Sequence, residues 1–142
     1  NCLQNERQIP APVLAQPATF TIDMPDDLHS ARGRLHSVSL WLHLENLTVY
    51  DEVAVEFNGV QLPCDNPMRA GEYDPTPDAW LRYDLMDHLP VQGDNAVAVR
   101  MAVRNERLAA EMEVVIADME LEVRYDYPDG EWRRSRGWYP RT

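Results

Sequence analysis

The sequence contains no lysine, and all 13 of its basic residues are arginine. This usage fits either GC-rich coding DNA or selection for guanidinium pairing. Basic residues are also outnumbered by the 24 acidic residues, so the net charge is −11. A field of this sign repels nucleic-acid phosphates and anionic lipid headgroups. We therefore expect neither nucleic acid nor a membrane surface to be a partner.

Cysteine and long apolar runs are also scarce. The two cysteines, Cys2 and Cys64, match no zinc or redox spacing, and they form either one disulfide across a long loop or two separate thiols. A disulfide would indicate an oxidising compartment, and we expect an extracellular or periplasmic location. No apolar run approaches the roughly 20 residues of a membrane helix. No signal peptide is visible, but the chain begins at Asn1 without methionine, as a mature or excised fragment would.

The motifs of familiar catalytic sites are missing as well. The sequence has no Gly-x-Ser-x-Gly elbow, and no histidine has the spacing of a zinc site. The histidines are His29, His36, His43 and His88. Asp84 and Asp87 flank an expected turn and are better explained as caps for backbone N–H groups than as an acid and a base. We expect that this chain alone is not an enzyme.

What the sequence does contain is repeated alternation of apolar and polar residues. Such period-two runs, typical of half-buried strands, cover 18–23, 35–44, 53–57, 81–85, 97–103 and 112–125. The last run is either two short strands or one strand bent by a bulge near Asp118. A chain of 142 residues with 44% hydrophobic content can bury one core. Short strands without a clear long amphipathic helix predict an all-β sandwich.

Alternate residues in these runs are predicted to face the core. The predicted inward residues are Phe20, Ile22, Val38, Leu40, Leu42, Leu44, Val53, Val55, Phe57, Leu81, Tyr83, Leu85, Val97, Val99, Met101, Val103, Met112, Val114, Ile116, Met119, Leu121, Val123 and Tyr125. Asn58-Gly59 between apolar runs predicts a type I′ hairpin, because both residues tolerate positive φ. Gly93-Asp94-Asn95 predicts a compact end to the connection that Leu89 anchors.

The distribution of proline suggests the domain organisation. Residues 1–17 contain Pro10, Pro12 and Pro17 and are interpreted as an N-terminal linker or an arm laid along the domain. Residues 18–127 form the predicted sandwich, and the four prolines in 63–79 make that segment the longest expected loop. Residues 128–142 are a tail, linker or added strand. This arginine-rich tail either folds onto the acidic strand around Glu120 and Glu122 or contacts a neighbouring domain.

Three segments together resemble a galactose-binding-like domain: 51–62 with its hairpin, 83–95 with its turn, and the closing run 117–125. The resemblance covers about 20–127 and implies a jelly-roll β-sandwich of two antiparallel sheets with about seven to nine strands. Domains of this group are often appended to glycoside hydrolases and related polysaccharide enzymes. Some members bind sugars, often with a structural calcium ion, and others only brace a catalytic domain. No ligand-binding position is carried over by the resemblance.

Sugar recognition requires an aromatic ring for the apolar side of a pyranose and planar polar groups for its hydroxyls. One such group of residues lies in and just after the proline-rich loop. Its members are Arg69, Glu72, Tyr73, Asp74, Asp78, Trp80 and Arg82. Strand parity places Trp80 outside the core with Arg82 and Asp84, so Trp80 either contacts a ligand or caps the end of the sandwich.

A second group consists of Trp41 and His43, which alternate with inward leucines and therefore face outward. An outward tryptophan on a strand is either a ligand platform or is covered by another segment, and covering is the favoured interpretation. Ala54, Ala98 and Ala102 also face outward, and their small side chains would let the arm or the tail pack closely.

The acidic composition and the resemblance together suggest one structural ion, Ca²⁺. Asp23, Asp26 and Asp118 are the candidate oxygen ligands, and the sequence contains no EF-hand loop. No cofactor is required by the predicted function.

The resemblance, taken with these candidate residues, implies a non-catalytic carbohydrate-binding or accessory module of a larger polysaccharide-active enzyme. Its partners would be a polysaccharide or oligosaccharide and the catalytic domain of the same parent protein. The alternative is a structural interaction domain that docks on a catalytic domain or self-associates, without sugar binding.

Overall fold

The computed structural model describes residues 9–48, 50–63, 79–104 and 113–126, together with the backbone of 132–138. The elements within these ranges are nine strands and one short 3-10 helix, Arg32–Arg34. The strands are β1 (Ala11–Pro12), β2 (Ala18–Met24), β3 (Leu35–Glu45), β4 (Glu52–Phe57), β5 (Val60–Gln61), β6 (Ala79–Asp84), β7 (Gly93–Val103), β8 (Val115–Asp126) and β9 (Trp132–Trp138). No helix in the described part of the chain is long and apolar enough to cross a membrane.

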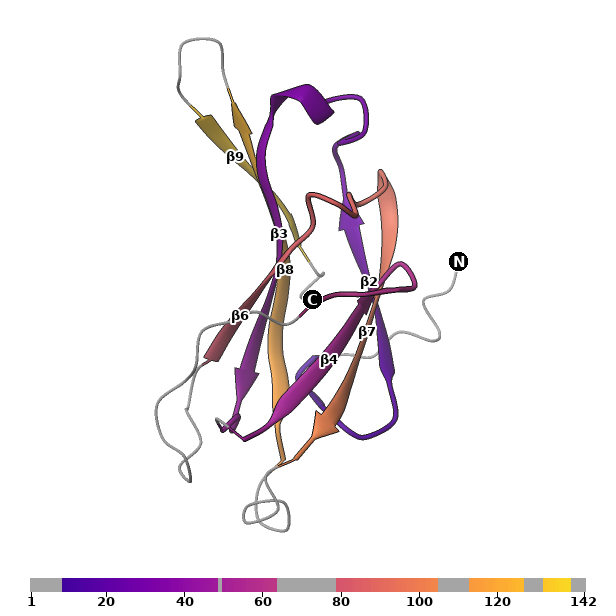
Figure 1. The fold of residues 1–142 in the computed structure, drawn as a ribbon, viewed down its shortest axis with the longest axis vertical. Coiled ribbons are helices and arrows are strands. Elements are labelled where there is room, and N and C mark those ends of the chain that lie inside the picture. Colours follow the sequence, from indigo (N-terminus) through magenta and orange to yellow (C-terminus); the bar gives the residue numbers. More distant parts are fainter. Residues whose placement is uncertain (1–8, 49, 64–78, 105–112, 127–131, 139–142) are drawn as a thin grey trace.

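The strands form two antiparallel sheets that face each other (Figure 1). One sheet has the order β1-β8-β3-β6, with β9 also paired to β8, and the other has the order β2-β7-β4-β5. Three pairs are nested along the chain, because β2 pairs with β7, β3 with β6, and β4 with β5. Nested antiparallel pairs rolled into two layers form a jelly roll. The predicted all-β sandwich of two antiparallel sheets is therefore confirmed.

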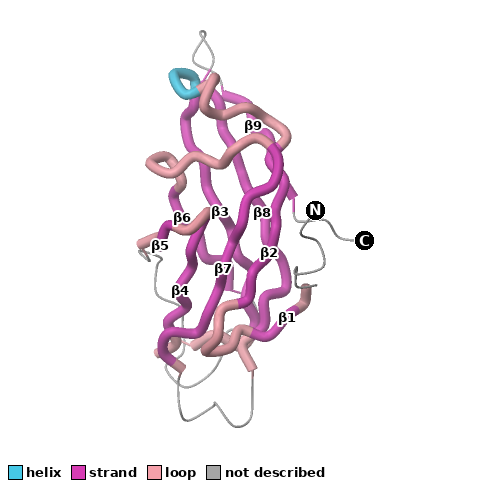
Figure 2. The backbone as a smooth tube through the Cα atoms, turned by 90° about the vertical axis from the view of Figure 1, so that its right-hand side faces the viewer, coloured by secondary structure: helices cyan, strands magenta, loops and turns pink. Residues whose placement is uncertain are grey.

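Segments from the two ends of the sequence both pair with β8. In β1, Ala11 lies opposite Ile116, whereas β9 runs antiparallel to β8 from Asp126 back to Glu120. Figure 2 shows β1 and β9 at different heights along the same side of the molecule. The pairing continues at the residue after β1, since the N–H of Val13 donates to the carbonyl of Val114 at 2.8 Å.

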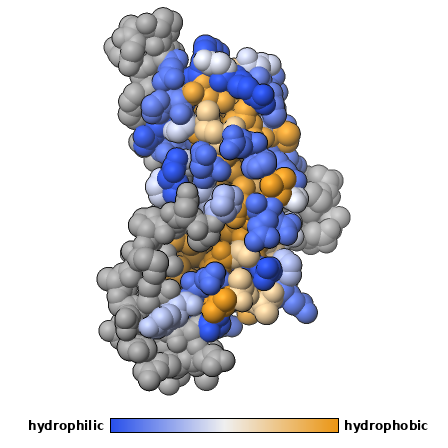
Figure 3. Space-filling view, viewed as in Figure 1, coloured by the Kyte–Doolittle hydropathy of each residue, from blue (hydrophilic) through white to orange (hydrophobic). Residues whose placement is uncertain are grey.

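The core lies between the two sheets and is built from the inward residues of the alternating runs. Phe20, Leu42, Phe57 and Tyr83 come from four different strands, and each is fully or almost fully buried. Figure 3 shows apolar residues gathered along the middle of the molecule, where the two layers of Figure 1 meet, with hydrophilic residues on either side. Burial of apolar area is the main driving force for this fold.

Three bulges interrupt the described strand pairs, at His36 of β3, Ala102 of β7 and Ala117 of β8, and the last two affect residues predicted to face inward. Glu52 lies opposite Val103 but Val53 lies opposite Met101, so Ala102 is an extra residue in β7. The prediction that Val103 faces inward is wrong, because this bulge turns its side chain to the exposed side.

In β8 the extra residue is Ala117, since His43 pairs with Asp118 and Leu44 with Ile116. This bulge lets Ile116 and Met119 both face the core. Of the two interpretations left open by the sequence, one strand bent near Asp118 is therefore the observed one.

The predicted turns are present and are stabilised by side-chain amides. Asn58 and Gly59 have φ of 49° and 87°, as a type I′ hairpin requires. Asn95 is buried, and its amide donates to the carbonyls of Val91 and Gly93 at 2.9 and 3.0 Å. Asp84 accepts a hydrogen bond from the N–H of Met86 at 3.4 Å, which is the capping role predicted for it.

Candidate functional site

The two groups of candidate sugar-binding residues come together on one surface. Strands β3 and β6 are neighbours in the same sheet, and their register places His43 opposite Trp80 and Trp41 opposite Arg82. Cross-strand partners share a face of a sheet. We refer to the outward surface formed by Trp41, His43, Trp80 and Arg82 as the aromatic face.

The three rings of the aromatic face contact one another in defined geometries. The ring of His43 stacks on the indole of Trp80, with 4.7 Å between centroids and 10° between planes. The indole of Trp41 meets Trp80 edge-on, at 6.3 Å and 77°. Trp80 is 45% exposed, whereas Trp41 and His43 are half-buried. Trp80 is therefore the most exposed ring of this cluster.

Local sequence explains why these side chains face outward. Leu40, Leu42 and Leu44 are fully buried, so the intervening Trp41 and His43 must point away from the core. Leu81 and Tyr83 impose the same parity on β6 and leave Trp80 and Arg82 outside. Among the described strands β6 is the edge of its sheet, so Trp80 has a strand neighbour on one side.

The side of the aromatic face toward β8 is acidic and covered. Glu120 and Glu122 lie opposite Trp41 and Ser39, yet they are only 7% and 6% exposed. The indole Nε1 of Trp41 donates to Oε1 of Glu122 at 3.4 Å, and the Arg124 guanidinium lies 3.6 Å from the same oxygen. Toward β8, therefore, Trp41 contacts a buried carboxylate, whereas toward β6 it contacts the exposed ring of Trp80.

The backbone of β9 lies directly beside the acidic residues of β8. Trp138 is opposite Glu120, and Arg136 is opposite Glu122. Part of the arginine-rich tail is thus an added strand along the acidic strand, one of the arrangements that the sequence left open.

The open side of the aromatic face has the chemistry of polar recognition. It combines an exposed indole with the exposed guanidinium of Arg82 and the exposed carboxylate of Asp84. An indole packs against the C–H side of a ring, and the charged groups pair with hydroxyls. The other predicted members of the first group lie outside the described residues, as do Cys2 and Cys64; these members are Arg69, Glu72, Tyr73, Asp74 and Asp78.

The candidate calcium ligands are not brought together. Asp23 is exposed on β2 and faces Asp94 across the strand pair. Asp26 accepts a hydrogen bond from the hydroxyl of Tyr125 at 2.6 Å, whereas Asp118 lies on β8 opposite His43. Within the described ranges no three His, Cys, Asp or Glu residues are grouped as metal ligands. The three aspartates lie on β2, in the loop after β2 and on β8, and local sequence does not reveal this arrangement.

The predicted small outward residues lie on the opposite sheet from Trp41. Ala54 and Ala98 line a small hollow of about 20 Å³ together with Pro17 of the arm. Ala102 lines a larger cleft with Leu14, and the carbonyl of Leu14 accepts a hydrogen bond from the N–H of Met101 at 2.7 Å. The arm therefore passes close to these alanines, whereas the aromatic face belongs to the other layer.

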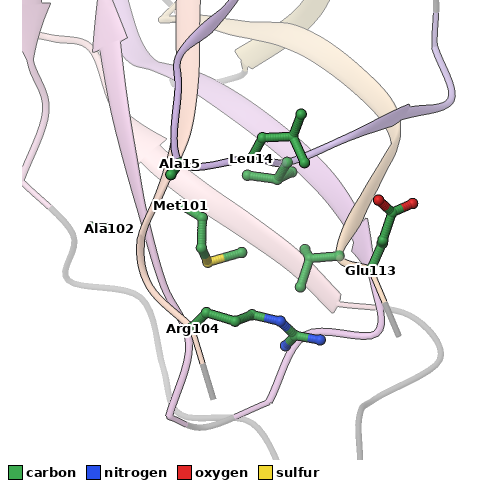
Figure 4. Close-up of a pocket in the computed structure, with 8 residues that line it drawn as sticks. Leu14, Ala15, Met101, Ala102, Arg104 and Glu113 are labelled. Atoms are coloured by element: carbon green, nitrogen blue, oxygen red, sulfur yellow. The ribbon is translucent and has the colours of Figure 1, made fainter. Parts of the chain in front are cut away.

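The larger cleft has a volume of about 370 Å³ and lies between the arm, the end of β7 and the start of β8. Figure 4 shows Leu14 and Met101 lining it together with the charged side chains of Arg104 and Glu113. Arg104 is committed to structure, because its guanidinium lies 2.8 Å from the buried carboxylate of Asp51. The cleft is mainly apolar, and Leu14 on its wall is 51% exposed.

A second hollow, of about 440 Å³, was not predicted from the sequence. We refer to it as the end hollow; the described residues that line it are Pro25, Asp26, Asp27, Ala31, Arg34 and Tyr125. Pro25 and the two aspartates that follow it do indicate a loop. However, Asp26 accepts a hydrogen bond from Tyr125, which lies 99 residues further along the chain. No local pattern indicates such a contact.

Neither a family model nor a curated protein sequence matches this chain. Among solved structures, the chain is similar to the α-L-rhamnosidase of Streptomyces avermitilis, crystallised in complex with L-rhamnose. The TM-score is 0.42 and the sequence identity is 13%, over 89% of this chain. The match spans 12% of the length of the rhamnosidase chain. The rhamnosidase activity is therefore attributed to that enzyme and not to this chain.

Proposed function

We propose that this protein is a non-catalytic carbohydrate-binding or accessory module of a larger polysaccharide-active enzyme, and that the aromatic face is its glycan-binding surface. The observation that carries the proposal is the exposed indole of Trp80, held against His43 and beside Arg82. An apolar ring bordered by charged hydrogen-bonding groups suits the amphipathic surface of a sugar.

Binding would need no chemical step. A pyranose ring stacks on the open part of the Trp80 indole, and Arg82 and Asp84 hydrogen-bond its hydroxyls. Such a small contact must offset the loss of translational freedom on association, so affinity should be weak, with a Kd on the order of micromolar to millimolar.

The aromatic face is preorganised for this role. His43 covers one side of Trp80, and the indole N–H of Trp41 is held by Glu122. Because both rings already have partners, little side-chain entropy would be lost when a sugar binds. This arrangement supports a fixed platform better than a set of independently moving surface side chains.

Affinity electrophoresis on soluble neutral polysaccharides tests the proposal. Wild-type protein should be retarded by at least one glycan, and Trp80→Ala should clearly weaken that retardation. Val91→Ala is the matched control, because Val91 has the same exposed fraction as Trp80, 45%, but lies in the β6–β7 turn. Absence of retardation on every glycan, or equal retardation of the two variants, would refute sugar binding by this face.

A second candidate function is an interaction domain that docks on the catalytic domain of the parent protein or on another copy of itself. The apolar cleft beside the arm favours it, since Leu14 on its wall is 51% exposed, and Val103, between the lining residues Ala102 and Arg104, is 46% exposed. Clustered exposed apolar residues are frequent in contact surfaces. Sedimentation of the wild type and of Leu14→Asp distinguishes this function: self-association that the substitution abolishes would support it, and a monomer at all concentrations would argue against self-association.

A further inference from the structure

The end hollow lies on different elements from the aromatic face. It is formed by the loop after β2, the 3-10 helix Arg32–Arg34 and the last residues of β8, at the end of the sandwich that is uppermost in Figure 1. Its volume of about 440 Å³ falls in the range of small-molecule sites, roughly 300–1,000 Å³. The polar groups that line the hollow determine which class of ligand it could bind.

The two carboxylates of the end hollow are held in place by other side chains. The hydroxyl of Tyr125 donates to Oδ2 of Asp26 at 2.6 Å. The hydroxyl and the N–H of Ser30 donate to the two oxygens of Asp27 at 2.7 and 3.3 Å. These bonds from Ser30 hold the pKa of Asp27 below its ordinary value. The hollow therefore presents fixed hydrogen-bond acceptors.

The guanidinium of Arg34 adds donors to the same hollow. Its side chain is exposed and forms no ion pair or hydrogen bond with any other described residue, Asp26 included. A fixed carboxylate and an uncommitted guanidinium thus line one space without pairing with each other. A hydroxyl group satisfies both, because it donates to a carboxylate and accepts from a guanidinium.

We propose that the end hollow binds a single neutral pyranose, with Asp26 accepting from one of its hydroxyls and Arg34 donating to an adjacent oxygen. Two carboxylates and one guanidinium leave a net negative charge, which disfavours an anionic ligand. This site is separate from the aromatic face, so it would give the domain a second point of sugar contact. It does not depend on whether Trp80 binds a glycan.

The test is a titration of the 142-residue chain with the methyl glycosides of D-glucose, D-mannose and D-galactose, followed by amide NMR spectra. At least one glycoside should cause saturable shifts of the Asp26, Asp27 and Arg34 amides. Arg34→Ala should weaken that binding by about tenfold or more, as expected when a charged hydrogen bond is lost. Asp26→Asn, which keeps the shape of the side chain, should also weaken it.

Two variants serve as controls in the same titration. Arg32→Ala removes an exposed guanidinium from the same 3-10 helix that does not line the hollow, and it should leave the affinity unchanged. Trp80→Ala should also leave it unchanged, which separates this site from the aromatic face. The proposal is overturned if no glycoside saturates these amides, if Arg34→Ala and Arg32→Ala bind equally well, or if L-alanine or sulfate saturates them and the glycosides do not.

Discussion

The imidazole of His43 lies parallel to the indole of Trp80, with ring centroids 4.7 Å apart. The two residues belong to β3 and β6 and are direct partners in the register of the sheet. Stacking on one side of the indole leaves its remaining surface exposed in a fixed orientation. This relationship defines the aromatic face, and its energetic contribution can be measured directly.

A double-mutant cycle should show coupling between the two rings. His43→Ala and Trp80→Ala, alone and together, should give a coupling energy of about 0.5–1 kcal/mol in the free energy of unfolding, because stacked rings contribute beyond their buried area. Urea denaturation of the four proteins provides the values. Strictly additive losses would mean that the stack contributes nothing to stability.

Removing the partner of a buried carboxylate should be costly. Asp51 is 3% exposed and accepts from the N–H and hydroxyl of Thr48 at 2.8 and 3.0 Å, as well as from Arg104. Arg104→Met should lower the free energy of unfolding by about 3 kcal/mol, because it removes a positive charge in direct contact with the buried carboxylate. Arg100→Met, on the outward side of β7, is the control and should cost less than about 1 kcal/mol. Similar losses in both variants would contradict this account.

The buried amide of Asn95 should be a major determinant of stability. It accepts hydrogen bonds from the side chain of Asn58 and the N–H of Val91, at 2.9 and 2.8 Å, and donates to two carbonyls. Asn95→Ala should cost about 2–3 kcal/mol in chemical denaturation, since the buried partners would lose their bonds. Gln92→Ala, in the same turn but exposed, should cost less than about 1 kcal/mol. A near-neutral Asn95→Ala would show that water replaces the amide.

One strand pair carries like charges that face each other. Asp23 of β2 is the register partner of Asp94 of β7, and both are exposed. Directly opposed like charges destabilise a sheet, so Asp94→Asn should raise the free energy of unfolding by a few tenths of a kcal/mol at low salt. The gain should shrink as salt screens the repulsion. Asp87→Asn in the exposed turn is the control, and an equal or larger gain there would contradict the assignment.

Ser30 should determine the ionisation of Asp27. Its two hydrogen bonds hold the pKa of Asp27 below the ordinary value, with a smaller contribution in the same direction from the charge of His29. A carboxyl whose pKa is lowered on folding contributes stability above its unfolded pKa, and this contribution is lost as the pH falls through the folded pKa. Ser30→Ala should therefore raise the pKa of Asp27 in an NMR titration, whereas His29→Ala should raise it less. An unchanged value in Ser30→Ala would contradict the role of these bonds.

Much of the secondary structure could be predicted from local sequence. Strand parity correctly placed Leu40 and Leu42 inside and Trp41 and Trp80 outside, because a pleated strand with one buried face must alternate. Asn58-Gly59 identified its hairpin, since few other dipeptides adopt positive φ twice. Parity failed at Val103, where the bulge at Ala102 depends on the partner strand.

The sequence by itself thus determined which residues form strands, which faces are apolar and where the tight turns lie, because these properties depend on neighbouring residues. Tertiary structure alone decided that His43 meets Trp80, that Glu122 holds Trp41, and that Tyr125 reaches Asp26. Each of these contacts joins distant segments whose register is set by the burial of two sheets at once. Both the aromatic face and the end hollow depend on such contacts, which is why only the folded chain brings their residues together.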